Sequence, residues 1–422
     1  MLSRRSFLGS LAAGVALPHA AQQPDASLPP SIAALTPMRD GVQPITAAER
    51  RGRIDKARRL MGQHRIDALM LTGGTSLVYF SGIRWGVSER LFAMVLPVKG
   101  EAFYVCPAFE EGRAREQIAT GPLGHSADVR TWQEHESPYA RVARGLRDRG
   151  IATGRLAIEE NVRFAFSHGV AEAAGQLQIV DGTPVTAGCR MTKDAHELAL
   201  MSHASAVTLK AYEAAYRALK DGMTQNDFAD LVATAHERLG YTGDAGVQVS
   251  EYSALPHGSL TPQVVREGTI LLIDGGCTVE GYWSDLSRTF VLGKPTDTMK
   301  KVFEIVLRAQ TAALKAARPG LPCEAVDAAA RQVIEDAGYG PDYTFFTHRV
   351  GHGLGMDIHE WPYLVKGNRL PLEPGMTFSD EPGIYIRGEF GVRLEDDMHV
   401  TDSGAELFTP QIPSIERPFG TT

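Results

Sequence analysis

The chain has 422 residues, of which 43% are hydrophobic and 22% charged, the composition of an ordinary globular protein long enough for two domains. Its formal net charge is -7, and the acidic and basic residues are dispersed rather than gathered in runs. Because no basic tract is present, the composition argues against nucleic acid as a partner.

The first 21 residues have the organisation of an export signal. The segment begins with Arg4 and Arg5, continues with an apolar stretch over 8–17, and ends on Ala20 and Ala21. The apolar stretch is too short to span a bilayer as a helix. The arginine pair predicts a twin-arginine signal, with an ordinary Sec signal as the alternative. We therefore expect a periplasmic protein that makes no membrane contact after signal removal.

The rest of the chain is predicted to form a linker and two domains. Residues 22–44 are rich in proline, alanine, serine and glutamine without an apolar period, which predicts a linker. Thr46 and Glu49 form a capping box, so a helix is expected to begin there. Strand-like and helix-like patterns then alternate, which predicts an α/β domain over 45–190. This domain carries no cluster of histidines, cysteines or carboxylates, and the chemistry is expected in a second domain over 194–415.

The cysteines match no metal-binding or redox motif. A protein that folds before export does not need disulfides, so we expect buried free thiols, with pairing in the exported protein as the alternative. The four residues are Cys106, Cys189, Cys277 and Cys323.

The second domain contains an internal repeat. Residues 220–224 separate two long helical patterns, and the second of these ends at 240–241. Later in the chain, residues 318–322 separate another two helical patterns, and the second of these ends at 338–339. The offset is 98 residues at both the closing glycine and the closing tyrosine. Each helix pair precedes a strand-rich segment with a histidine motif and two carboxylates, which predicts a duplicated unit with a site between its halves. These residues are His257, Asp274 and Asp285 in the first half, and His352, Glu381 and Glu395 in the second.

Five of these six residues form a predicted metal site. Four carboxylates and one imidazole carry too much negative charge to share a pocket unless cations neutralise them. Oxygen-rich ligands with one nitrogen suit two divalent ions, manganese first, with cobalt or zinc as alternatives. Two such ions activate water at neutral pH, so the set predicts hydrolysis. The predicted ligands are Asp274, Asp285, His352, Glu381 and Glu395.

Asp274 and Asp285 are expected to meet in a β-hairpin. Strand patterns over 269–279 and 282–292 are separated by Glu280-Gly281, a two-residue turn. In this register the two carboxylates point to the same face as diagonal neighbours, about 7–8 Å apart at the backbone. A slip of one residue would place them on opposite faces.

The second half of the repeat has a similar plan. Glu381 precedes a strand pattern over 384–387, and the chain returns through 392–395. Arg393 and Glu395 share one face of the returning strand. We therefore expect Arg393 to brace the carboxylates, with a simple structural salt bridge as the alternative.

Two further histidines are candidates for function. His359 follows His352 by seven residues beyond a glycine-rich turn, and His257 lies between a proline and a glycine. Their place beside the predicted carboxylates indicates a role at the site, although a structural role is an equal alternative for His257. His348 and His399 are expected to be structural.

With these motifs the chain resembles a known family, the pita-bread metallopeptidases. This group contains Xaa-Pro dipeptidase (prolidase), aminopeptidase P and methionine aminopeptidase. Residues 46–187 resemble the creatinase/prolidase N-terminal domain, which methionine aminopeptidases lack. The resemblance implies an α/β (α+β) fold, a creatinase-like N-terminal α/β domain followed by a pseudo-twofold pita-bread catalytic domain, in a protein that can form a homodimer. The motifs that carry it are Pro256–Gly258, Ile273–Gly276, Ser284–Thr289, His348–Gly355, His359–Pro362, Glu381–Gly383 and Val392–Asp396.

The resemblance also implies a role for each site residue. Two of the carboxylates would bridge both metals, one would bind the first metal, and the histidine and remaining glutamate would hold the second. Two further histidines would contact the substrate or the developing oxyanion. The bridging carboxylates would be Asp285 and Glu395, and Asp274 would bind the first metal. His352 and Glu381 would hold the second metal, and His257 and His359 would contact the substrate.

The implied function is hydrolysis of Xaa-Pro bonds, as a dipeptidase or an aminopeptidase, by a hydroxide that bridges the metals. The substrate is a small peptide with proline at its second position. Glu381 would carry the proton to the proline nitrogen, and Arg349 or Arg393 is a candidate to bind a substrate carboxylate, although structural bracing is favoured for each. The alternatives are a same-fold enzyme acting on a non-peptide substrate, as a lyase or C–N hydrolase, and a non-catalytic binding protein, against which the intact ligand set argues.

Overall fold

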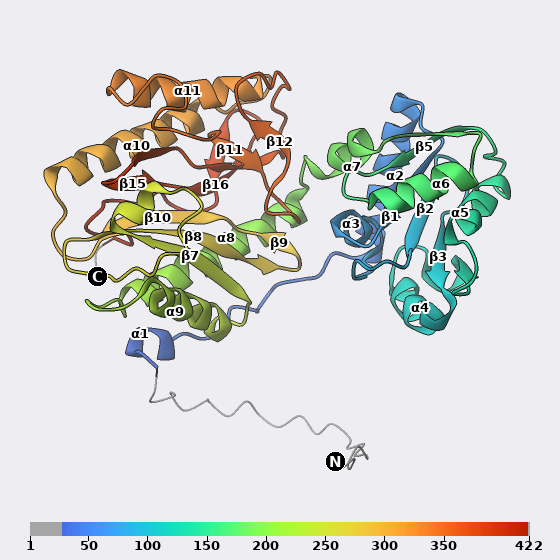
Figure 1. The fold of residues 1–422 in the computed structure, drawn as a ribbon, viewed down its shortest axis with the longest axis horizontal. Helices are drawn as coiled ribbons and strands as arrows, with labels where there is room; N and C mark the ends of the chain where they lie inside the picture. Colours follow the sequence, from blue (N-terminus) through green and yellow to red (C-terminus); the bar gives the residue numbers. More distant parts are fainter. Residues whose placement is uncertain (1–27, 421–422) are drawn as a thin grey trace, which may run out of the picture.

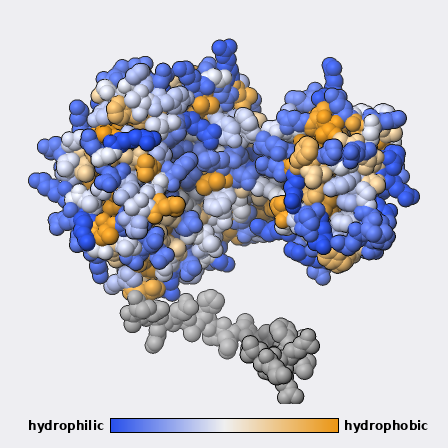
Figure 2. Space-filling model, viewed as in Figure 1, coloured by the Kyte–Doolittle hydropathy of each residue, from blue (hydrophilic) through white to orange (hydrophobic). Residues whose placement is uncertain are grey.

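The structure is a computed structural model that describes residues 28–420, so the expected signal at 1–21 lies outside the described residues. The chain folds into two domains that lie side by side and meet at a narrow waist (Figures 1 and 2). The surface in Figure 2 is mostly hydrophilic, with scattered hydrophobic side chains. Among the described residues, we find no helix with the length and apolar character that a bilayer crossing requires.

The N-terminal domain is a six-stranded sheet with helices packed on both faces (Figure 1). The strand order is β4-β3-β2-β1-β5-β6, in which β2 runs antiparallel to both neighbours and the other pairs are parallel. Every residue of the three central strands β1, β2 and β3 is buried, which explains their apolar sequences. The helices are α2 (Ala47–His64), α3 (Thr75–Ser81), α4 (Glu111–Thr120), α5 (Pro138–Arg147), α6 (Phe164–Ala173) and α7 (Thr183–Arg190), and the strands are β1 (Ala68–Thr72), β2 (Ala93–Pro97), β3 (Phe103–Pro107), β4 (Asp128–Trp132), β5 (Gly154–Ile158) and β6 (Leu177–Asp181).

Residues 28–44 are part of the fold rather than a free linker. The short helix α1 (Pro30–Ala33) packs against α8 (Ala195–Tyr216) and α9 (Gln225–Arg238) of the second domain, and Ile32 and Leu35 are buried there. The hydroxyl of Ser31 donates to the carbonyl of Ala214 across 2.8 Å. This corrects the prediction of a linker for its described part, since a few apolar side chains in a polar segment were enough to dock it.

The second domain contains two copies of one helix-pair unit, placed on opposite sides of its sheets (Figure 1). The matched ends confirm the repeat. Gly240 and Gly338 both close a helix with a left-handed backbone, φ 92° and 91°. The tyrosine that follows each glycine donates its N–H to the carbonyl five residues earlier. The helix pairs are α8 (Ala195–Tyr216) with α9 (Gln225–Arg238), and α10 (Asp297–Ala316) with α11 (Cys323–Asp336).

The strands of this domain form three small sheets. Their orders are β10-β8-β7 with β9 paired to β8, then β12-β11-β13-β16-β17, then β14-β15. A bridge between Ser287 and Glu395 joins the first half of the repeat to the second. The strands are β7 (Gly243–Val249), β8 (Ile270–Val279), β9 (Tyr282–Trp283), β10 (Leu286–Val291), β11 (Gly351–Gly353), β12 (Glu360–Leu364), β13 (Thr377–Asp380), β14 (Gly383–Ile386), β15 (Phe390–Arg393), β16 (Asp396–Val400) and β17 (Ala405–Leu407).

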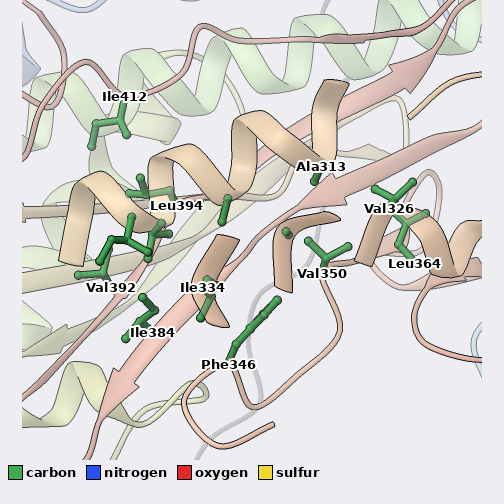
Figure 3. Close-up of a cluster of buried hydrophobic side chains, with 14 of the residues drawn as sticks. Ala313, Val326, Ile334, Phe346, Val350, Leu364, Ile384, Val392, Leu394 and Ile412 are labelled. Atoms are coloured by element: carbon green, nitrogen blue, oxygen red, sulfur yellow. The ribbon is translucent and has the colours of Figure 1, made fainter. Parts of the chain in front are cut away.

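A hydrophobic cluster between the second helix pair and the strands supports the chain that enters the site (Figure 3). Ile334 of α11 and Phe346 of the loop before β11 belong to this cluster, together with Val350 and Val392. All four side chains are fully buried. Because Val350 lies two residues before His352, the core holds that histidine's strand in place.

The four cysteines are free and buried, which is the expected alternative and not the paired one. Burial also raises the pKa of each thiol, to about 12 for Cys106 and Cys189 and about 11 for Cys277 and Cys323, which keeps them protonated and unreactive.

Candidate metal centre

The β8–β9 hairpin brings Asp274 and Asp285 together in the predicted register. Val279 pairs with Tyr282, and further along Ser287 pairs with Asp274. Asp285 is therefore a diagonal neighbour of Asp274 on the same face. The hairpin closes tightly because both turn residues, Glu280 and Gly281, have positive φ (51° and 91°), the combination found in a type I′ turn.

Gly276 allows this hairpin to close beside the site. A Cβ at this position would lie 1.8 Å from the carbonyl oxygen of Ser284, a distance no side chain tolerates. Only glycine therefore permits the backbone approach that aims Asp285 inward.

Strands from the second half supply the other three predicted ligands. His352 lies in β11, Glu381 follows β13, and Glu395 follows β15. Each of the sets His352–Glu381–Glu395 and Asp274–Asp285–Glu395 places one ligand atom per residue within 4.8 Å of the others. Because Glu395 belongs to both sets, the five side chains form one continuous cluster.

His359 also reaches this cluster. Its ring centroid lies 3.8 Å from that of His352, and it forms a third set within 4.8 Å with Asp285 and His352. The sequence predicted that His359 contacts the substrate. In the structure His359 is also close enough to Asp285 and His352 to bind a metal ion with them. Its side chain is exposed, whereas that of His352 is buried, so His359 lies on the open side of the cluster.

The carboxylates repel one another strongly in this site. Burial, then the charges of Asp274 and Asp397, raise the pKa of Asp285 well above its ordinary value. Burial, followed by the charge of Asp285, does the same to Glu395. Burial, opposed by Arg393, raises the pKa of Glu381 to about 7. The ionised cluster is therefore unstable without cations.

Arg393 partly offsets this repulsion, as expected from its position. Its guanidinium lies 2.6 Å from the carboxylate of Asp274 and 3.9 Å from that of Glu395. Burial acts to raise the pKa of Asp274, but Arg393 and a hydrogen bond from Ser287 hold it below the ordinary value. Arg393 also donates to the carbonyl of Pro256 across 3.0 Å, which ties the segment of His257 to the carboxylates.

His352 presents a neutral nitrogen to the cluster. Burial, followed by the repulsion that a protonated His359 would exert, lowers the pKa of His352 to about 3. Its Nδ1 lies 3.1 Å from the carbonyl oxygen of Gly353, the contact of an N–H donor, which leaves Nε2 as the free lone pair. That Nε2 lies 3.3 Å from Glu381 and 3.7 Å from Asp285.

This donor set fits divalent cations. Four carboxylates face one contacting guanidinium, the histidine is neutral, and the carboxylate charges oppose one another. Cations bound by the cluster would replace that repulsion with attraction. Oxygen donors with one imidazole are the ligands of hard and borderline divalent ions.

The cluster lies at the wall of a cavity of about 380 Å³, a volume suited to a small ligand. His257 and His359 line the cavity together with Arg349, so both candidate histidines lie at the site. Arg349 stacks on the ring of Tyr363 at 4.0 Å and lies 3.5 Å from Nδ1 of His359. Apolar surface comes from Pro256, Tyr343 and Val365.

His348, expected to be structural, also lines this cavity. Its Nδ1 lies 3.8 Å from Glu381, and its Nε2 lies 2.7 Å from the hydroxyl of Tyr385. Burial and the charge of Arg393 lower its pKa to about 3, so the ring is neutral. One feature of the sequence indicates that His348 lies at the cavity, its position four residues before His352 in a glycine-rich turn. His399, the other histidine assigned a structural role, stacks on Phe408 away from the cavity.

Sequence reasoning missed the hydroxyls that hold the ligands. Ser287 bonds to Asp274 at 2.7 Å and to Glu395 at 2.6 Å, joining the two halves. Ser379 accepts from the backbone N–H of His352 and donates to Glu381. A serine in a strand gives no sequence signal of this role, because its partners are distant in the chain.

Two family models match the chain. The model described as metallopeptidase family M24 matches residues 199–402, and the model described as creatinase/prolidase N-terminal domain matches residues 53–192. The first match corresponds to the C-terminal domain of the structure, and the second match corresponds to the N-terminal domain.

Known proteins resemble the chain over most of its length. A probable dipeptidase, PepE, from Mycobacterium tuberculosis is 37% identical over 340 residues, covering 80% of this chain and 88% of the relative. An Xaa-Pro dipeptidase from Lactobacillus delbrueckii subsp. lactis is 32% identical over 364 residues, covering 84% and 96%. The crystal structure of dipeptidase PepE from Mycobacterium ulcerans matches with a TM-score of 0.83 at 34% identity, covering 89% of this chain and 99% of that one. These similarities confirm the predicted two-domain pita-bread fold.

Proposed function

The chain belongs to metallopeptidase family M24 and is a metal-dependent peptidase, and we propose that it hydrolyses Xaa-Pro bonds, as a dipeptidase or an aminopeptidase. The observation that carries this proposal is the cluster of five ligand side chains at the wall of a peptide-sized cavity. The Xaa-Pro dipeptidase similar to this chain supports the choice of substrate.

Two divalent ions, manganese first, fit the cluster. Asp274, Asp285 and Glu395 would hold one ion, and His352, Glu381 and Glu395 the other, with Asp285 also shared. When bound, such a pair lowers the pKa of water toward neutrality and polarises a carbonyl. Ser287 and Arg393 hold the carboxylates in place for this task, because Ser287 bonds to Asp274 and Glu395, and Arg393 donates to Ser287 and pairs with Asp274.

Glu381 is the group proposed to move the proton. One of its oxygens, Oε1, accepts from Ser379 at 3.2 Å, which leaves Oε2 to accept a proton from water. From there the proton passes to the proline nitrogen as the peptide bond breaks.

His257 and His359 are proposed to stabilise the oxygen that gains charge during attack. Both line the cavity, and burial together with the charge of Arg349 lowers the pKa of His359, so its imidazole is neutral. A neutral imidazole can donate an N–H to the developing oxyanion.

The cavity offers surface for a proline ring. Pro256, Tyr343 and Val365 present apolar atoms, and a tertiary amide nitrogen brings no N–H that needs an acceptor. Arg349 lies at the same cavity with its guanidinium against a tyrosine ring, where it can pair with the carboxylate that follows proline in a dipeptide.

Steady-state kinetics on peptides of increasing length test this function. The purified protein, loaded in turn with manganese, cobalt and zinc, is assayed on Ala-Pro, Gly-Pro and a longer Xaa-Pro peptide, with Ala-Ala as the control substrate. A dipeptidase cleaves only the first two, and an aminopeptidase cleaves the longer peptide as well. Asp285→Asn protein with reduced metal content should be inactive in both cases. Folded, metal-loaded wild-type protein that cleaves none of the Xaa-Pro peptides would refute the proposal.

We further propose that the protein reaches the periplasm by a twin-arginine signal, on the basis of Arg4 and Arg5. Cell fractionation of a tagged full-length chain tests this. Replacement of both arginines by lysine should retain the protein in the cytoplasm, whereas unchanged export would indicate a Sec signal instead.

A further inference from the structure

Arg190 of the N-terminal domain contacts the loop of the catalytic domain that carries His359. It is the last residue of α7, the helix that contacts β12 at the junction of the domains (Figure 1). Its guanidinium forms ion pairs with two carboxylates, Asp357 at 2.5 Å and Glu360. These two acidic residues stand on either side of His359, two positions before it and one after.

The contacts around Arg190 are largely buried and mutually supporting. The side chains of Arg190 and Glu360 are 11% and 6% exposed. Lys193, only 2% exposed, reaches the other oxygen of Glu360 at 2.5 Å, and Thr75 of α3 donates to the other oxygen of Asp357. Ion pairs at this depth are weakly screened, and loss of one partner leaves the other charge buried and unpaired.

His359 has little else to define its position. Its side chain is exposed and lies against the ring of His352 at an angle of 35°, and its one polar contact among the described residues is at 3.5 Å from Arg349. The chain leaves the sheet at a bulge where Glu360 pairs with Gly353, so residues 354–359 form a loop. The place of the imidazole therefore depends on how the two flanking carboxylates are held.

We propose that Arg190 is a positioning residue for catalysis, holding His359 where it can donate to the oxygen of the scissile bond. This inference rests on the proposed function and deepens it. It gives the N-terminal domain, which contributes no ligand to the cluster, a part in the reaction. A histidine displaced by about 1 Å from a productive position can lower the rate by about 10²-fold.

Substitution of Arg190 tests the proposal, with kcat and KM measured separately on Ala-Pro. Arg190→Gln should lower kcat by about 10- to 100-fold with a smaller change in KM, because the contact acts in the transition state. Arg190→Lys, which keeps the charge but lacks the planar fork, should recover part of the loss. The matched control is Arg53→Gln, which breaks another buried pair between the domains, Arg53–Glu197 at 3.2 Å, and should leave kcat unchanged.

A double-mutant cycle separates positioning from general destabilisation. In a His359→Ala background, Arg190→Gln should cause no further loss of kcat, since the residue on which it acts is gone. Multiplicative losses in the double variant, or a kcat for Arg190→Gln equal to that of wild type, would overturn the inference.

A second readout keeps this test apart from the test of the function itself. In ¹⁵N-labelled protein the imidazole signals of His359, identified by their loss in His359→Ala, should shift or broaden in Arg190→Gln and remain unchanged in Arg53→Gln. If wild-type protein cleaves no Xaa-Pro peptide, the proposed function fails while these signals still report the positioning. Signals unaffected by Arg190→Gln refute the positioning even in an active enzyme.

Discussion

Replacement of Arg331 should destabilise the catalytic domain and disturb the loop that leads into the metal centre. Arg331 in α11 forms two bonds to Asp327, at 3.1 and 3.2 Å. It also donates to the carbonyl oxygens of Asp342, Phe346 and His348, at 2.9 to 3.0 Å. One guanidinium therefore holds a helix and a loop together.

The size of the effect follows from burial. Asp327 and Arg331 are 2% and 6% exposed, and Asp327 also accepts the backbone N–H of Val350 at 2.9 Å. Arg331→Met leaves this carboxylate buried without its cation, which costs about 3–5 kcal/mol. In a domain of about 200 residues each kcal/mol lowers Tm by about 2–4 °C, so we expect a fall of about 6–20 °C.

Differential scanning fluorimetry of the metal-loaded protein measures this change. The control is Arg308→Met on the exposed face of the neighbouring helix α10, which should change stability by no more than about 0.5 kcal/mol. The double variant Asp327→Leu/Arg331→Met should recover part of the loss, because no charge is left unpaired. A Tm for Arg331→Met within 2 °C of the control, a shift of about 1 kcal/mol or less, would refute the reasoning.

Three further predictions concern charge and close packing. The pKa of Glu381 is about 7 in the metal-free site, above its ordinary 4.5, so metal-free protein should lose stability, by about 3 kcal/mol from this group, as pH rises from about 4.5 through 7. Thermal scans in chelator should show this loss and scans in manganese should not. The hydrogen bond from His196 to Glu49 raises the pKa of the histidine, so its contribution is present below pH 6.5 and is lost as pH rises through the raised value. The Tm difference between wild type and His196→Gln should therefore be larger at pH 5.5 than at pH 9, and an equal difference would contradict this. Gly276→Ala places a Cβ 1.8 Å from the carbonyl of Ser284, so measured metal content should fall below that of wild type, and normal metal content would show that the hairpin can relax.

Local sequence rules were sufficient for the hairpin of the site. The turn Glu280-Gly281 sets the pairing of β8 with β9 by its backbone geometry alone, and alternation along the strand then places Asp274 and Asp285 on one face. The capping box at Thr46, in which Glu49 returns the bond, was predictable for the same reason. Each of these features depends on residues close in sequence.

Features that depend on distant contacts were not predictable in this way. The role of Ser287 arises because β10 lies beside Glu395, 108 residues later in the chain. The docking of Ile32 on α8 and α9 depends on a groove that exists only after both helices have packed. A histidine can lie at the surface or in a site, and its identity alone does not say where. For His348 the location is decided by neighbours such as Tyr385.

The sequence by itself identified the family, the five candidate ligand side chains and the internal repeat, because these depend on residue identity and short-range spacing. Only the tertiary structure decided the distances among those side chains, the balance of charge set by Arg393, and the link from Arg190 to the loop of His359. The reason is physical. Burial and ion pairing depend on which segments meet in space, and the segments that meet here come from two halves of a repeat and from two domains.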